Sequence, residues 1–307
     1  MSQFIRRHPI ASFFVWFFTV GQLLAFTPLL IGDALGPAQL FICASTLVGL
    51  LLPALVITRI VDGPGAVRAM LARAVALRAG LGWYLLALVG VPLVAAVITV
   101  LVAGPPSRFP VGALVPHLLL PLVLTLLPNN LWEEVAWTGF VQARLQDRRG
   151  PLVAALLTGP MFALQHVSGV VSNGPVGAAV LLVVLVVLVT PFRFLTGWVY
   201  NRTGSLFLVG LVHGMGNAVA GGSGFDTGLL AHLYPGQTVA TMAHLVAFFL
   251  VGLVVVIVTR GRLGIRTSGP ASPAPAPRSA PASRGIRTPH AADAPGSAGS
   301  PPPGNRW

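Results

Sequence analysis

The segment 131–140 reads LWEEVAWTGF and places two adjacent glutamates, Glu133 and Glu134, in an otherwise apolar stretch. The chain contains no other glutamate. An ionised side chain at the centre of a bilayer costs about 2.5 to 3.5 kcal/mol on insertion scales. Because the chain avoids glutamate elsewhere and keeps two here, we predict a functional site at this pair.

Composition sets the class of protein around that pair. Hydrophobic residues make up 55% of the 307 residues, charged residues make up 8%, and the mean hydropathy is +0.83. These values exclude an ordinary water-soluble domain and predict an all-α polytopic membrane protein. The net charge of +12 comes from arginines in short clusters between apolar segments, so it indicates topology and no nucleic-acid partner. The single cysteine, Cys43, allows neither a disulfide framework nor a thiolate metal site.

Long apolar segments predict a bundle of about eight transmembrane helices. These segments are 11–31, 38–58, 82–103, 113–145, 151–167, 175–200, 205–220 and 241–259. The connections on one side carry nearly all the arginines, and by the positive-inside rule that side is the cytoplasm. We therefore expect a multi-pass protein of the plasma membrane with both termini in the cytoplasm.

The same segments divide the chain into five parts. These are a cytoplasmic N-terminus (1–10), transmembrane helices one to three (11–112), a core of helices four to seven with the polar residues (113–220), an outer loop with helix eight (221–259) and a basic tail rich in Pro, Ala and Ser (260–307). We expect a disordered, cytoplasmic tail, because its composition buries too little apolar surface to offset the entropy of ordering.

Polar side chains on three of the predicted core helices fall at similar depths. The helical rise of about 1.5 Å per residue places four of them about 12 to 22 Å from the cytoplasmic ends of their helices: Glu133, His166, His213 and Asn217. Adjacent helical residues point about 100° apart, so we expect Glu133 to face a shared cavity while Glu134 packs against a neighbouring helix. The other membrane-region histidines are expected to be structural or solvated: His117, His232 and His244.

Two kinds of chemistry suit this polar layer. Without a metal, Glu133 and His166 can take a proton from water while His213 and Asn217 donate hydrogen bonds to a developing oxyanion. With a metal, Glu133, His166 and His213 form a His2Glu set that could hold zinc and leave one position for water. The compact two-histidine helix motif of many zinc enzymes is absent from the sequence. Both routes predict hydrolysis.

Three motifs follow one another along the core. They are EEVAWTGF at 133–140, Phe162-x3-His166, and RTGSL at 202–206 leading to His213-x3-Asn217. In this order they resemble the CPBP family of intramembrane proteases, the bacterial relatives of type II CAAX prenyl endopeptidases. The resemblance covers about Leu114 to Ala220. It implies a bundle of about eight transmembrane helices with a cavity open to the cytoplasm.

The resemblance also implies roles for single residues. Glu133 matches the base that activates water, and Glu134 matches the second motif glutamate. His166 matches the histidine that assists the water, while His213 and Asn217 match the pair that holds the oxyanion.

One position departs from the family pattern. The family usually has an arginine five residues after the first glutamate, where this chain has Thr138. That arginine would partner the second glutamate. Glu134 is therefore expected either to be protonated or to pair with Arg193, an otherwise unexplained arginine that could instead extend to the membrane interface.

The function predicted from these observations is an intramembrane peptidase whose substrate is a peptide or membrane protein in the lipid bilayer. Two alternatives remain, a catalytically silent membrane scaffold or chaperone and a carrier of small solutes or protons. A carrier should show repeat-related broken helices, and the sequence has no such counterpart in its second half. A scaffold would tolerate the loss of Glu133. The sequence predicts no oligomeric state.

Overall fold

The computed structural model describes residues 2–32, 37–222 and 227–265. In these ranges the chain forms helices and no strands, and one isolated bridge pairs Gly222 with Thr227. Six helical segments of the described chain are long and apolar enough to cross a membrane, and two further apolar helices are shorter. The predicted all-α, multi-pass membrane fold is confirmed. The expected tail lies outside the described residues from position 266 onward.

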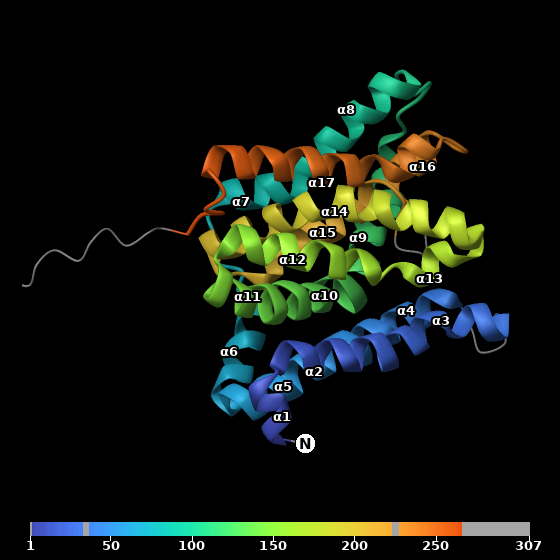
Figure 1. Ribbon diagram of the computed structural model, residues 1–307. Helices are drawn as coiled ribbons and strands as arrows, with labels where there is room; N and C mark the ends of the chain where they lie inside the picture. The colour runs from blue at the N-terminus through green and yellow to red at the C-terminus, as the bar shows by residue number, and fades with distance from the viewer. Residues whose placement is uncertain (1, 33–36, 223–226, 266–307) are drawn as a thin grey trace, which may run out of the picture. The chain divides into compact units, whose positions relative to one another are not determined.

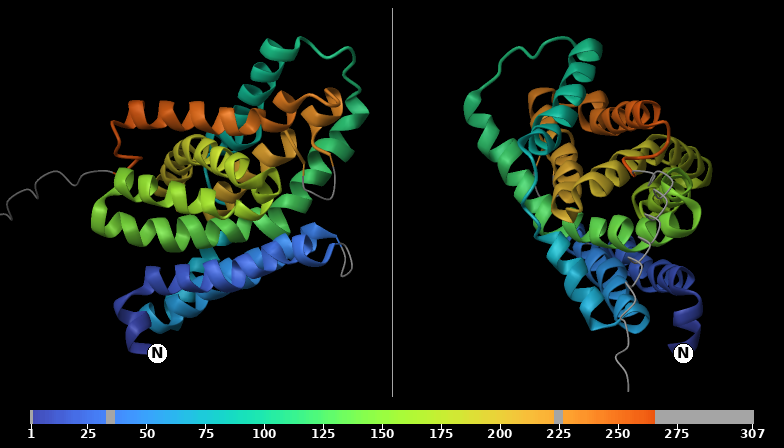
Figure 2. Two further views of the ribbon diagram at one scale, coloured as in Figure 1. Left: turned by 45° about the vertical axis from the view of Figure 1, so that its right-hand side comes forward. Right: turned by 90° about the vertical axis from the view of Figure 1, so that its left-hand side faces the viewer.

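The N-terminal part builds three of these spans. Its elements are α1 (Ser2–Arg7), α2 (Pro9–Trp16), η1 (Phe17–Gly21), α3 (Gln22–Ile31), α4 (Ala38–Ala44), η3 (Ser45–Leu51), α5 (Leu52–Asp62), α6 (Pro64–Ala74), α7 (Leu81–Leu85), η4 (Leu86–Gly90) and α8 (Val91–Ala103). The spans run from α2 to α3, from α4 to α5 and from α7 to α8, each through a π-helical turn. The first two pack against each other, and η3 contacts α10 (Figures 1 and 2).

The C-terminal part holds the remaining spans and both short helices. Its elements are η5 (Val111–Ala113), η6 (Val115–Leu119), α9 (Leu120–Thr125), η7 (Leu126–Asn130), α10 (Leu131–Ala136), η8 (Trp137–Gln142), α11 (Ala143–Arg149), α12 (Pro151–Leu164), α13 (Val167–Val170), η9 (Val171–Asn173), α14 (Gly174–Thr203), α15 (Leu206–Val219), α16 (Leu229–Leu233) and α17 (Thr238–Thr259). Helix α14 contacts both α12 and α17, while α10 contacts α15 (Figure 1). Helix α10 therefore lies between the first two spans and the C-terminal bundle.

Local sequence explains where the two short helices begin. Gly150 has φ of 77°, which favours glycine, and Pro151 then supplies the first residue of α12. Gly204 adopts the left-handed conformation that ends α14. The Ser205 hydroxyl then caps α15 by accepting a hydrogen bond of 3.1 Å from the Leu208 backbone N–H. Both helices therefore begin at sharp turns.

Most of the arginines lie at helix ends that are close to one another in the structure. We call this the arginine-rich end, and it is marked by Arg59, Arg144, Arg148, Arg149, Arg202 and Arg260. Arg144 of α11 forms an ion pair with Asp62 of α5. The Asn201 side chain of α14 donates to the side chain of Gln146 over 3.0 Å and to the Leu263 carbonyl over 2.9 Å. The ends of α5, α11, α14 and α17 are thus tied together.

The opposite end of the bundle has its own contacts. The Tyr234 hydroxyl, which follows α16, donates to the Gly104 carbonyl at the end of α8 over 2.9 Å. The rings of His117 and His232 stack at 3.7 Å between centroids. These two histidines are therefore packed against each other at this end and belong to its local structure.

An aromatic cluster joins the first span to the segment that carries the glutamates. Trp137 is fully buried and meets Phe13 and Phe17 at ring distances of 5.9 and 5.8 Å. Its indole N–H donates to the Gln165 side-chain oxygen over 2.5 Å. Trp137 thus fixes the helix after the glutamates against the first span and against the end of α12.

Candidate active site

The two glutamates lie on α10, a short α-helical stretch between the π-helical turns η7 and η8. The exposed fraction is 3% for Glu133 and 0% for Glu134. Because burying a carboxylate costs free energy unless it is paired or hydrogen-bonded, the partners of each oxygen determine what each glutamate can do.

Amide groups surround the Glu133 carboxylate. Its Oε1 accepts hydrogen bonds from the side-chain amides of Gln165 at 2.8 Å and Asn129 at 3.1 Å. Its Oε2 lies 3.4 Å from the amide nitrogen of Asn130. The Thr46 hydroxyl of η3 also lies 3.4 Å from Oε1. Glu133 is therefore held by neutral donors and has no arginine among these partners.

Glu134 has a different environment. Its Oε2 accepts hydrogen bonds of 2.6 Å from both the Arg193 guanidinium of α14 and the Thr138 hydroxyl. Arg193 is fully buried, and its guanidinium lies 4.7 Å from the ring centres of both Phe162 and Phe192. The cation expected at position 138 thus comes from another helix. Arg193 does not extend to a membrane interface.

His213 of α15 links the two acidic groups. Its Nδ1–H donates to Glu134 Oε1 over 3.0 Å and lies 3.7 Å from Glu133 Oε2. Its Nε2 lies 3.4 Å from the amide nitrogen of Asn130, which can donate to it. Since a carboxylate only accepts, the bond to Glu134 places a proton on Nδ1.

The other two predicted residues lie nearby. Asn217, one turn beyond His213 on α15, donates to the Asn130 side-chain oxygen over 3.2 Å. His166 follows the end of α12, and its Nδ1 lies 3.2 Å from the Phe162 carbonyl. In the described structure His166 makes no hydrogen bond to Glu133. A carbonyl only accepts, so Nδ1 carries the proton and Nε2 of the neutral ring is left as an acceptor.

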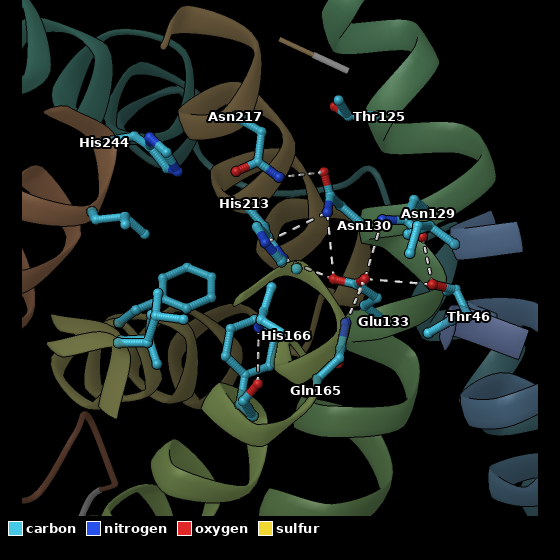
Figure 3. A pocket seen from close by; sticks show the side chains of 18 of the residues that line it. Thr46, Thr125, Asn129, Asn130, Glu133, Gln165, His166, His213, Asn217 and His244 are labelled. Carbon is cyan, nitrogen blue, oxygen red and sulfur yellow. Dashed lines mark hydrogen bonds and ion pairs between the residues drawn. The ribbon is translucent and has the colours of Figure 1, made fainter. Parts of the chain in front are cut away.

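A cavity of about 480 Å³ brings these groups together (Figure 3). Four of the five predicted site residues line it: Glu133, His166, His213 and Asn217. Glu134 does not line it. The two adjacent glutamates thus point in different directions, as expected for neighbouring residues of a helix. Glu133 faces the cavity and Glu134 faces Arg193.

Sequence reasoning missed several polar residues of the cavity. Asn129 and Asn130 precede Glu133 by four and three residues, and Gln165 precedes His166. Helical spacing to the glutamate could have identified the two asparagines. His244 of α17 also lines the cavity, although its sequence context predicts a structural or solvated residue. Figure 3 shows it on the side of the cavity away from Glu133 and Thr46.

The side chains around Glu133 can be compared with the ligands that a metal ion would need. Among the residues that the structure describes, no group of three His, Cys, Asp or Glu side chains could hold a metal ion. Amide N–H groups point at Glu133 Oε1, and the Asn130 amide nitrogen lies 3.4 Å from His213 Nε2, the ring nitrogen that a metal would need. The Glu133, His166 and His213 set as arranged does not fit zinc. The zinc alternative stays a prediction that this geometry does not support.

A known protein family matches the segment that carries these site residues. Residues 115–219 match the family model described as type II CAAX prenyl endopeptidase Rce1-like. The chain carries an Rce1-like domain. The predicted resemblance is thereby confirmed, and its expected limits, Leu114 and Ala220, differ by one residue at each end. A search of the curated proteins found no match.

The Rce1-like domain begins in η6 and ends at the last residue of α15. It contains every predicted site residue as well as Arg193, the partner of Glu134. Thr46 and His244 lie outside it, on η3 and α17, so the cavity is completed by helices on both sides of the domain. Together with the apolar spans, the Rce1-like match supports a multi-pass membrane protein of the intramembrane CAAX protease type.

Proposed function

We propose that this chain is an intramembrane peptidase in which Glu133 activates a water molecule to attack a peptide bond. The observation that carries the proposal is the unequal environment of the two glutamates. Arg193 neutralises Glu134, whereas Glu133 faces the cavity and is held only by neutral donors. A carboxylate that faces a cavity and is held by amide and hydroxyl groups, without an arginine partner, is suited to accept a proton.

The reaction needs four changes of bonding. A water molecule beside Glu133 gives a proton to its carboxylate as the water oxygen bonds to the peptide carbonyl carbon. The carbonyl oxygen becomes an oxyanion. As the tetrahedral intermediate collapses, the C–N bond breaks and the leaving nitrogen takes up the proton. His166 can relay this proton, because its Nε2 is an acceptor when the ring is neutral.

His213 and Asn217 would donate hydrogen bonds to the oxyanion. The Asn217 side-chain N–H lines the cavity and can turn from Asn130 to the substrate. His213 can help as an imidazolium, because Nδ1–H stays on Glu134 and a proton at Nε2 can be donated to the oxyanion once the Asn130 amide turns away. The Glu134–Arg193 pair would then hold the orientation of His213 and stabilise its charge.

The test is Glu133→Gln, which keeps the shape of the side chain and removes the base. Purified protein in detergent is incubated with a pool of quenched-fluorescent peptides, and we expect hydrolysis to be lost while the melting temperature stays close to that of the wild type. The matched control is Asp62→Asn, the same change outside the cavity, which should leave hydrolysis unchanged. Wild-type hydrolysis by Glu133→Gln would refute the role of Glu133, whereas no hydrolysis by the wild type itself would favour the catalytically silent scaffold.

A further inference from the structure

We propose that Gln165 and Asn129 are positioning residues for Glu133, which hold its Oε1 and leave Oε2 as the oxygen that takes the proton from water. The inference rests on the proposed function and names the reacting atom of its base. It also gives the first two membrane spans a part in the reaction, because Gln22 and Thr46 of those spans hold the two positioning residues.

The two oxygens of the Glu133 carboxylate have unequal partners. An ionised carboxylate offers about four acceptor sites, roughly two on each oxygen. The amides of Gln165 at 2.8 Å and Asn129 at 3.1 Å occupy those of Oε1 (Figure 3). Within the described residues Oε2 has only longer contacts, 3.4 Å to the Asn130 amide nitrogen and 3.7 Å to His213 Nδ1. Oε2 is therefore the oxygen that can accept a hydrogen bond from a water molecule.

The orientation of the Gln165 amide follows from the chemistry of its neighbours. The Trp137 indole N–H can only donate, and it lies 2.5 Å from the side-chain oxygen of Gln165. The reverse orientation would set two donors against each other at Trp137 and two acceptors against each other at Glu133. Both neighbours are buried, so neither can turn to bulk water instead. The NH2 group of Gln165 is thus fixed toward Glu133 Oε1.

Asn129 is oriented in the same way from the second span. The Thr46 hydroxyl of η3 is buried and donates to Asn129 Oδ1 over 2.5 Å. A hydroxyl carries one proton, and Asn129 is the nearer acceptor, since Glu133 Oε1 lies 3.4 Å away. The NH2 group of Asn129 is left for Glu133. Two chains of hydrogen bonds therefore meet at one oxygen, and each passes through a side-chain amide.

The outer support of these chains comes from the first two spans. Gln22 of α3 donates to the backbone carbonyl of Gln165 over 3.2 Å, and Thr46 lies on η3. Both residues lie outside the segment 115–219 that matches the family model. A reacting group must be held to within about 0.5 Å of its productive position. The spans outside the Rce1-like domain thus help to fix Oε2 by holding Oε1.

The first test is Gln165→Met, which keeps the length of the side chain and removes its amide. We expect kcat to fall roughly 10- to 100-fold with KM close to that of the wild type, because a misplacement of about 1 Å can cost ~10²-fold. The matched control is Gln146→Met, whose amide pairs with Asn201 at the arginine-rich end, and its kcat should be unchanged. An unchanged or higher kcat for Gln165→Met, or a change in KM alone, would overturn the proposal.

Thr46→Val is a second variant, on another helix, that decides the matter if Gln165→Met lowers the melting temperature strongly. It keeps the shape of the side chain and removes the hydroxyl that orients Asn129. We expect a lower kcat with little change in KM. The control is Thr99→Val in α8, a buried threonine whose hydroxyl donates to the Ala95 carbonyl, and its kcat should be unchanged. Wild-type kcat for Thr46→Val would overturn the positioning by Asn129.

Infrared spectroscopy tests the hold on Oε1 without the need for activity. The difference spectrum between the wild type and Glu133→Gln isolates the carboxyl band of Glu133. Taken in a Gln165→Met background, this band should shift, because the carboxyl group loses a hydrogen-bond donor, whereas Gln146→Met should leave it in place. An unshifted band in Gln165→Met would overturn the proposal. A shifted band without hydrolysis by the wild type would refute the proposed peptidase, and the base at Oε2 with it, while the hold on Oε1 stands.

Discussion

Arg193 shows how a missing charge can be supplied from another helix. The family pattern predicts an arginine at position 138, yet Thr138 and Arg193 share one oxygen of Glu134 there. The guanidinium is buried between two aromatic rings, and its Nε and Nη1 make no hydrogen bond within the described residues. Such a cation depends on Glu134 for most of its compensation, because isolated buried charges are strongly unfavourable.

We expect Arg193→Ala to be severely destabilising, by about 3 to 5 kcal/mol, because it leaves the buried Glu134 carboxylate without its cation. Adding Thr138→Arg should restore much of the loss, since it returns a guanidinium to the position that the family uses. Melting temperatures of the two single variants and the double variant in detergent measure this coupling.

The control for that cycle is Asp62→Asn, which removes the exposed carboxylate of the ion pair with Arg144. A surface pair of this kind contributes at most about 1 kcal/mol, so the melting temperature should change little. Additive effects of Arg193→Ala and Thr138→Arg would contradict the exchange of one arginine for the other.

Asn217 allows a test of oxyanion support. We expect Asn217→Ala to lower kcat about 10² to 10³-fold with a small change in KM, because an oxyanion donor acts mainly in the transition state. Asn173→Ala is the matched control. Its side chain donates to the Val170 carbonyl and does not itself line the cavity, so kcat should be unchanged. A rise in KM alone for Asn217→Ala would assign it to substrate binding instead.

At this scale the sequence predicts the polar layer but not all of its members. Glu133, His166, His213 and Asn217 stand out because polar residues are rare in apolar helices. His244 is equally rare, but depth alone does not show that α17 turns it toward the cavity. The sequence identifies Arg193 as a candidate partner of Glu134. The contact itself depends on how α14 packs against α10, and helical periodicity gives no information on that packing.

Helix α14 meets α17 at a close backbone crossing. A Cβ atom added at Gly252 would fall against the carbonyl group of Pro191, and backbone cannot move aside as a flexible side chain can. We expect Gly252→Ala to destabilise the protein by about 1 to 3 kcal/mol or more, because the two helices must separate. A lowered melting temperature in detergent measures the effect.

Gly82→Ala is the control for this crossing. Gly82 lies within α7, and a Cβ atom there would meet no atom within 4 Å. Alanine has the higher helix propensity, so the melting temperature should stay the same or rise slightly. Equal losses from the two variants would show that the close approach at Gly252 is not the cause of its destabilisation.

At the element scale, the apolar pattern predicts the six long apolar segments and the two shorter apolar helices of the described residues, and it misplaces most of their ends by only a few residues. Length and composition suffice for that because a bilayer sets a narrow range of span lengths. The π-helical turns were not predicted. They add one residue to a turn without changing composition, so neither hydropathy nor spacing reveals them.

The whole membrane unit has one end rich in arginine and one nearly without it. If the arginine-rich end is cytoplasmic, a green fluorescent protein fused after Trp307 should be fluorescent, whereas alkaline phosphatase at the same place should be inactive. Phosphatase fused after Gly104, at the opposite end, should be active and serves as the control. Active phosphatase after Trp307 would reverse the predicted topology.

The two π-helical turns beside α10 have a consequence for changes in chain length. Each turn holds one residue more than a regular α-helical path requires. Deleting one residue from η8 would therefore yield an uninterrupted helix of ordinary geometry. Because the extra residue is absorbed within the turn, the side chains beyond the deletion would keep their orientation relative to Glu133, and Arg144 would still face Asp62. A deletion in the regular helix α11 would instead turn every later side chain by about 100°. The span should thus tolerate the loss of one residue in η8 better than the loss of one residue in α11.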